Sequence, residues 1–234
     1  MKVLQKRGHS TPLKYVYELH DIRVGRCAGI LARHLGLSAS DAQMIARAAA
    51  LHDIGKLGIS SSIWRKPGTL TAEEWLAVKR HPEIGADWLS GSSSPVMRLA
   101  GSIALTHHER WDGSGYPLGL SGDNIPLAGR ITMMMDQYDA LRSERSYKLS
   151  MTHLQACTII LEGDDRTRPQ HFDPHLLDLF RCFHQEFNVV FQSFQKGSPS
   201  LQRRGSMVVS DTPLFSHTEP KYTSRHHQYG AGHC

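Results

Sequence analysis

The sequence predicts an all-α protein, a single helical bundle of about seven helices. Apolar residues recur at helical spacing over most of the chain, and no run alternates apolar and polar residues as a half-buried strand would. The first 195 residues are long enough to bury one sizeable core, whereas the last 39 have no helical apolar period and contain 13 Gly, Pro or Ser.

The expected helices are delimited by their own boundary signals. Thr71 and Glu74 are spaced as a capping box, Pro95 can open a helix, and Asp173 can cap one that has Pro174 at its first position. The glycines and prolines between His108 and Pro126 cannot sustain a helix, so a long loop is expected there. Helices are predicted over 16–35, 38–51, 71–81, 95–106, 127–143, 150–161 and from 174 onward.

Three segments follow from this pattern: a lead-in over 1–13, one domain over 14–195, and a flexible, disordered tail over 196–234. The formal net charge is +5, and the tail carries five bases and two acids, which leaves only +2 on the rest. A nucleic acid polymer is therefore not an expected partner.

The sequence also favours a cytoplasmic protein with no membrane contact. No apolar stretch approaches the roughly 18 residues that a spanning helix needs, and no secretory signal is recognisable. The four cysteines are widely spaced and are expected to be reduced thiols.

Histidines and aspartates carry the chemical signal. His52 and Asp53 adjoin at the end of one predicted helix, His81 precedes Pro82, His107 and His108 end another helix, and Asp136 lies on the next. Side chains of this kind from several helices can meet as a metal site inside a bundle. Imidazole and carboxylate without thiolate favour iron, manganese, zinc or similar ions.

The order of these residues and their neighbours resembles the HD-GYP branch of the HD phosphohydrolase superfamily, whose members are cyclic di-GMP phosphodiesterases. His-Asp alone marks only the superfamily, whereas His-His-Glu followed by Asp-Gly-Ser-Gly-Tyr-Pro is particular to the branch. The resemblance runs from about His20 to Phe180 and makes 14–195 a catalytic domain. It is carried by four motifs: Leu51-His52-Asp53-Ile54-Gly55-Lys56, His81-Pro82-Glu83, His107 to Pro117, and Asp136-Gln137-Tyr138-Asp139-Ala140-Leu141.

The resemblance implies two divalent ions, most simply iron or manganese, bridged by Asp53. The implied metal ligands are His20, His52, Asp53, His81, His107, His108 and Asp136. Asp53 and Lys56 are the implied catalytic residues, and hydrolysis of cyclic di-GMP to pGpG, with slow further cleavage to GMP, would use a hydroxide bridging the ions. The implied substrate contacts are Lys56, Tyr116, Asp139, Arg145 and Lys148.

The loop with Gly113, Gly115, Tyr116 and Pro117 is expected to border the active site and to contact GGDEF-type cyclases. A homodimer is a further expectation. In the family a third ion goes with a Glu four residues before the first His ligand, and Val16 stands there in this chain, so a two-metal centre is predicted. Only 19 residues precede His20, too few for a receiver or sensor domain, so either regulation comes from elsewhere or this chain is part of a longer protein.

Two alternatives remain open at this point. One is an HD phosphohydrolase for another cyclic dinucleotide or a nucleotide, because the motifs define the reaction type better than the base. The other is a catalytically weak module that binds cyclic di-GMP or a cyclase.

Overall fold

The computed structural model describes residues 14–16, 18–64, 66, 68–143, 150–195 and 206–208. Its described residues form nine α-helices: α1 (Leu19–His34), α2 (Ala39–Ala49), α3 (Ser61–Trp64), α4 (Ala72–Val78), α5 (His81–Ser90), α6 (Pro95–Thr106), α7 (Leu127–Arg142), α8 (His153–Glu162) and α9 (Pro174–Gln195). Three 3₁₀ turns, η1 (Ile54–Gly58), η2 (Gly122–Asn124) and η3 (Pro169–His171), lie between them.

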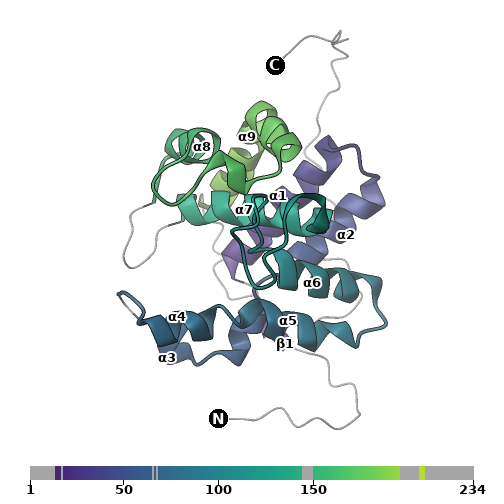
Figure 1. Ribbon diagram of the computed structural model, residues 1–234. Coiled ribbons are helices and arrows are strands. Elements are labelled where there is room, and N and C mark those ends of the chain that lie inside the picture. The colour runs from purple at the N-terminus through teal and green to yellow at the C-terminus, as the bar shows by residue number, and fades with distance from the viewer. Residues whose placement is uncertain are drawn as a thin grey trace.

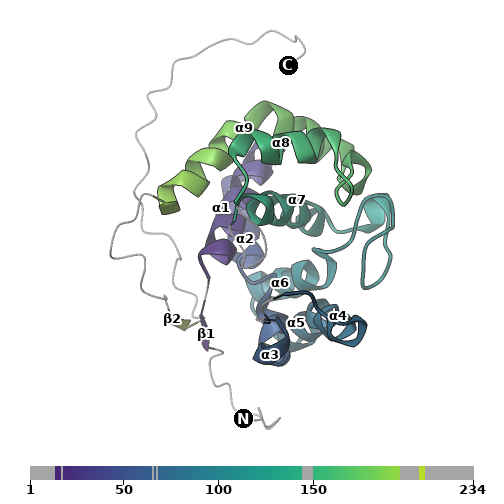
Figure 2. The same cartoon turned by 90° about the vertical axis from the view of Figure 1, so that its left-hand side faces the viewer.

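The bundle is layered around α7. This helix lies between α8 and α9 on one side and α6 on the other, with α5, α4 and α3 beyond α6 (Figures 1 and 2). Helix α1 packs on α2, α7 and α9. Helix α7 contacts both α1 and α6, and α2 also contacts both of them. Residues from distant parts of the chain therefore meet at the centre of the bundle.

The core between these layers is apolar and fully enclosed. Ile131 and Met134 of α7, Leu31 of α1 and Phe180 and Phe187 of α9 are all completely buried. Burial of a large apolar side chain contributes about 1.5–3 kcal/mol each, so this cluster holds α7 in place between α1 and α9. Helix α7 in turn carries Asp136 and Asp139.

The predicted all-α fold is confirmed, and most helix ends fall where their signals lie. Thr71 and Glu74 form the reciprocal capping box, and the Asp173 side chain accepts the His175 N–H at 2.9 Å ahead of α9. The sequence pattern did not predict α3 and α5 as separate helices. Helix α3 has only four residues. Pro82 does not merely interrupt a helix but lies near the start of α5, where a residue without an N–H is tolerated.

The first helix begins later than expected. It starts at Leu19, because Glu18 acts as its N-cap and the Glu18 N–H donates to the Asp21 carboxylate at 2.9 Å. Val16 instead lies in β1 (Lys14–Val16), which pairs antiparallel with β2 (Ser206–Val208), Lys14 opposite Val208. The strands are 190 residues apart in sequence, so no local pattern could indicate their pairing. Otherwise the predicted tail over 196–234 lies outside the described residues.

Two further expectations meet the structure here. Within the described ranges, no helix has the length and apolar character required to cross a membrane. Cys27 and Cys157 are free thiols, as expected for these two cysteines.

Candidate metal centre

Three histidines of the centre follow the carboxyl ends of helices. The Nδ1 of His52 lies 2.8 Å from the Ala49 carbonyl, that of His81 lies 2.8 Å from the Val78 carbonyl, and that of His107 lies 2.9 Å from the Ala104 carbonyl. The last carbonyls of a helix have no partner inside it, so a following imidazole can satisfy them. Because a carbonyl only accepts, each Nδ1 carries the ring proton and each Nε2 keeps a lone pair.

These lone pairs are directed at one another. His81 Nε2 lies 3.2 Å from His107 Nε2 and 3.2 Å from His108 Nε2, and His52 Nε2 is buried with no hydrogen-bond partner. Facing acceptors repel one another unless a cation lies between them. Burial lowers the pKa of His107 to about 4, so a second proton on that ring is disfavoured. The residues therefore fit a metal ion, and the Nδ1 bonds are the outer contacts that metal-bound imidazoles usually make.

A second part of the centre joins α1 to α7. His20 Nε2 lies 3.1 Å from Asp136 Oδ1, and His20 Nδ1 lies 2.7 Å from Asp139 Oδ2. Arg23 donates two hydrogen bonds to Asp139, at 2.6 and 2.7 Å, a bidentate pair. Both Asp139 oxygens are thereby bound by side chains of α1. Because Asp139 binds Nδ1 of His20, only Nε2 of that ring faces the centre.

Asp53 lies between the two parts. It is 6% exposed, its Oδ1 lies 3.3 Å from His81 Nε2, and its Oδ2 lies 3.4 Å from His52 Nε2. Ligand atoms of Asp53, His81, His107 and His108 form one group with metal-site spacing, and those of His20, Asp21, His52 and Asp53 form another. Since Asp53 is common to both, its carboxylate has the position required of a bridge between two ions.

Charge balance in the centre follows from these contacts. Burial raises the pKa of Asp53, but the positive charge of Lys56 is the largest of the effects that outweigh it and hold that pKa well below its usual range. Burial lowers the pKa of His20, but hydrogen bonds to Asp136 and Asp139 outweigh it and raise the pKa to about 10. Lys56 forms an ion pair with Asp53, and its side chain is 34% exposed, so one cation of the centre faces the solvent.

The glycine-rich loop is folded against the centre. The Tyr116 ring stacks on His108 with 4.7 Å between ring centroids, and the Tyr116 N–H donates to the His108 carbonyl at 3.1 Å. A Cβ on Gly115 would lie 2.5 Å from Glu109 Cα and 2.6 Å from the His108 carbonyl oxygen, so only glycine fits. The loop thus places an aromatic side chain directly beside a candidate metal ligand.

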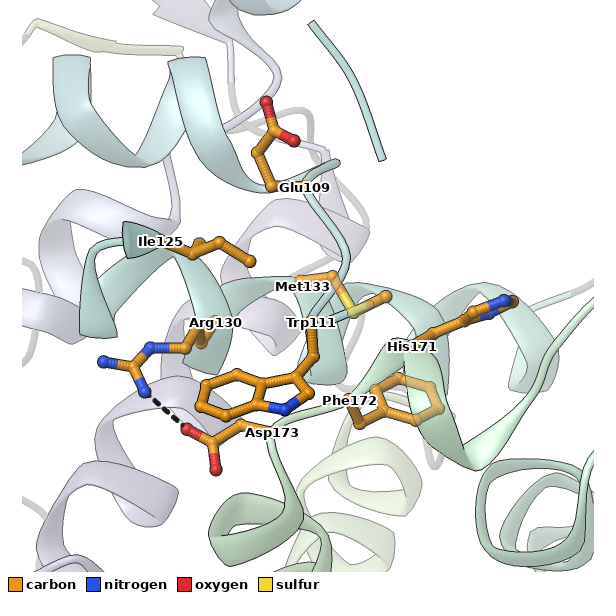
Figure 3. A pocket seen from close by; sticks show the side chains of 8 residues that line it. All are labelled: Glu109, Trp111, Ile125, Arg130, Met133, His171, Phe172 and Asp173. Atoms are coloured by element: carbon orange, nitrogen blue, oxygen red, sulfur yellow. Dashed lines mark hydrogen bonds and ion pairs between the residues drawn. The ribbon is translucent and has the colours of Figure 1, made fainter. Parts of the chain in front are cut away.

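Glu109 binds the second half of the loop by hydrogen bonds. It is 1% exposed, and its two oxygens accept the N–H groups of Leu118 at 2.7 Å and Leu120 at 3.0 Å. Behind it lies a small pocket lined in part by Trp111, Arg130 and Asp173 (Figure 3). Arg130 joins the pocket wall to the start of α9 by an ion pair with Asp173 at 2.7 Å.

Most of the residues that the sequence singled out come together here. His20, His52, Asp53, His81, His107, His108 and Asp136 converge, with Lys56 and Tyr116 at the edge. Arg145 and Lys148 lie outside the described residues. Sequence reasoning missed Asp21 and gave no role to Arg23 or Glu109, although Arg23 follows His20 in its motif and Glu109 is part of the His-His-Glu motif.

A helical bundle whose histidines and aspartates converge at its centre defines a metal-binding helical protein of the histidine–aspartate class. The chain belongs to the HD domain family, whose model matches residues 8–176. This result and the similarity to the relatives below agree with the HD-GYP resemblance.

The relatives are bacterial. The chain is 46% identical over 154 residues to a probable cyclic di-GMP phosphodiesterase of Vibrio cholerae, covering 63% of this chain and 34% of that protein. It is 45% identical over 171 residues to the 3′3′-cGAMP-specific phosphodiesterase 2 of the same species, covering 73% and 32%. The chain thus spans about a third of the length of these relatives.

Two more comparisons extend this result. A cyclic di-GMP phosphodiesterase of Thermotoga maritima is 50% identical over 129 residues, which cover 55% of this chain and 35% of that protein. Among solved structures, an HDG"Y"P protein from Bdellovibrio bacteriovorus matches with a TM-score of 0.52 and 20% identity, covering 69% of this chain and 51% of that one. The structural match supports the fold alone.

Proposed function

We propose that this chain is a metal-dependent phosphodiesterase that hydrolyses cyclic di-GMP. The observation that carries the proposal is the shared position of Asp53 between two groups of ligand atoms. When bound there, two divalent ions would supply an activated water and would neutralise phosphate charge. The mixed imidazole and carboxylate set suits iron or manganese.

The chain's own residues supply binding and orientation. Lys56 offers an ammonium at the exposed edge of the centre, where it would bind a non-bridging phosphate oxygen. Tyr116, stacked on His108, offers a ring face and a hydroxyl to the substrate. Arg145 and Lys148 would bind the second phosphate and a guanine edge. The contacts of Asp139 with His20 and Arg23 favour an orienting role over the substrate contact expected from the motif.

The product of the first cleavage is pGpG in this proposal, with slow further cleavage to GMP. Cyclic di-GMP is favoured because relatives with that name include the 50% identical one, while 3′3′-cGAMP is the second candidate because other relatives are named for it. The proposal also includes docking of GGDEF-type cyclases at the loop, where Leu118 is 56% exposed. A homodimer stays a prediction.

Metal content and turnover test the proposal together. Purified protein loaded with iron or manganese should bind two ions and convert cyclic di-GMP to pGpG faster than 3′3′-cGAMP. Asp53→Ala should lose both ions and turnover, because two nearby cations would lack their shared anion. His175→Gln, at an exposed position on α9, is the matched control. Full metal occupancy with wild-type turnover in Asp53→Ala would refute the assigned metal centre. Binding of cyclic di-GMP without turnover by the metal-loaded wild-type protein would refute the enzyme and favour a cyclic di-GMP sensor.

A further inference from the structure

A third group of metal-ligating side chains lies apart from this centre, between α8 and α9. His153 and Cys157 are four residues apart on α8, so they share one face of the helix, and His184 approaches them from α9. One ligand atom from each residue lies within 4.8 Å of the others. The two helices pack on each other at the edge of the bundle (Figures 1 and 2).

A chain of hydrogen bonds joins the two imidazoles to α7. A guanidinium only donates, so Arg142 donates to the Tyr138 hydroxyl at 2.7 Å, and that hydroxyl shares a hydrogen bond of 2.9 Å with His153 Nδ1. His153 Nε2 in turn shares a hydrogen bond of 2.8 Å with His184 Nδ1. A hydrogen bond between two ring nitrogens requires a lone pair on one of them, and such a lone pair is what binds a metal ion.

Two separations within the group can be compared with a tetrahedral zinc site. Zinc bonds of about 2.0–2.1 Å to nitrogen and 2.3 Å to sulfur place ligand nitrogens about 3.3 Å apart and nitrogen and sulfur about 3.6 Å apart. Cys157 Sγ lies 3.7 Å from His153 Nε2 and also 3.7 Å from His153 Nδ1, so the ring must turn until Nε2 faces the sulfur. The separation of 2.8 Å between His153 Nε2 and His184 Nδ1 must open by about 0.5 Å.

We propose that His153 Nε2, His184 Nδ1 and Cys157 Sγ form a second metal site, distinct from the first, that takes Zn²⁺. Two imidazoles and a thiolate select a softer ion than the carboxylate-rich centre does. Both imidazoles are only partly buried, so an ion can enter from solvent and water can complete its coordination.

Binding would release one proton and would fix the position of another. The Cys157 thiol loses its proton to solvent as the zinc–sulfur bond forms, one proton released per ion. With Nε2 bound to the ion, the ring proton of His153 is on Nδ1, which donates to the Tyr138 oxygen, the outer bond typical of a metal-bound imidazole. Tyr138 is on α7 between Asp136 and Asp139, so the ion would tie α8 and α9 to the helix that serves the first centre.

Cobalt titration of the full chain tests the site, because Co²⁺ bonded to thiolate absorbs in the near ultraviolet. Among the candidate groups in the described ranges only this one contains a cysteine, so the band reports this site. We expect it to saturate at one equivalent, to be displaced by Zn²⁺ and to vanish in Cys157→Ala and His184→Gln. His175→Gln, on the same helix, should retain it.

Two further measurements keep the result decisive. Asp53→Ala should retain the band, so failure of the first centre and failure of this site are distinguishable. In the wild-type protein, zinc binding at this site should release one proton, and Cys157→Ala should abolish that release. The proposal is overturned if the wild-type protein shows no thiolate band, or if folded Cys157→Ala keeps it.

Discussion

Replacing Glu109 by Gln should open the glycine-rich loop while leaving the bundle folded. Its carboxylate accepts two backbone N–H groups, those of Leu118 and Leu120. Glutamine keeps the shape but has one oxygen and one NH₂ group, so one of the two amides would face a donor. A hydrogen bond to a charged group contributes about 1.5–3 kcal/mol, and leaving a buried donor unpaired costs about 1–3 kcal/mol.

The closed loop should therefore be destabilised by about 2–4 kcal/mol in Glu109→Gln, since one bond is lost and the other weakened. Glu109→Ala, which loses both bonds, should cost roughly twice that. Every 1.4 kcal/mol is a factor of about ten in an equilibrium, so Leu118 and Leu120 amide exchange should accelerate about 30- to 1,000-fold in Glu109→Gln.

Amide hydrogen exchange at Leu118 and Leu120 measures this directly, and turnover of cyclic di-GMP should fall because Tyr116 is on the same loop. Asp112→Asn is the matched control: Asp112 is an exposed carboxylate of the same loop that accepts hydrogen bonds from Ser114 and lies 3.9 Å from His171, without a bond to the Leu118 or Leu120 amides. Unchanged exchange at both amides in Glu109→Ala would refute the role given to Glu109.

Three other changes test separate parts of the structure. Gly55→Ala would overlap the His81 carbonyl oxygen and should destabilise the fold by about 3 kcal/mol or more, measured by urea unfolding, whereas Gly36→Ala, with φ of +88° and open space around it, should cost about 1 kcal/mol. Lys148→Ala should raise KM and leave the metal content unchanged; loss of the ions would refute its assignment to the substrate phosphate. Burial and then the Arg110 charge lower the pKa of His171, so at a given pH the unfolded chain binds more protons at this ring than the folded protein does. The free energy of unfolding should therefore decrease as the pH falls below about 6.5. The corresponding decrease in Tm should be smaller in His171→Asn, whereas His175→Asn should behave as the wild-type protein does.

Features with local causes were predictable. The Thr71 capping box and the start of α9 depend on hydrogen bonds between residues at most four apart, which a sequence pattern can encode. The histidines and aspartates of the centre were found because each belongs to a short motif in a fixed order. The family resemblance, and not the helical period, assigned them to one site.

Features that depend on distant contacts were not predictable. Arg23 binds Asp139 across 116 positions, and Glu109 binds amides 9 and 11 residues later on a loop without regular structure. Asp21 is next to His20, about 100° round the helix, and only the packing of α1 shows that it is buried beside the centre.

Three imidazoles of the centre are oriented by main-chain carbonyls, at Ala49, Val78 and Ala104, and not by other side chains. Every amino acid carries a carbonyl, so substitution at those three positions preserves the orienting bond as long as the helix still ends there. The orientation of these rings is thus independent of the side-chain substitutions that accumulate between distant relatives. A designer could vary the packing around the centre widely and need only protect where α2, α4 and α6 stop.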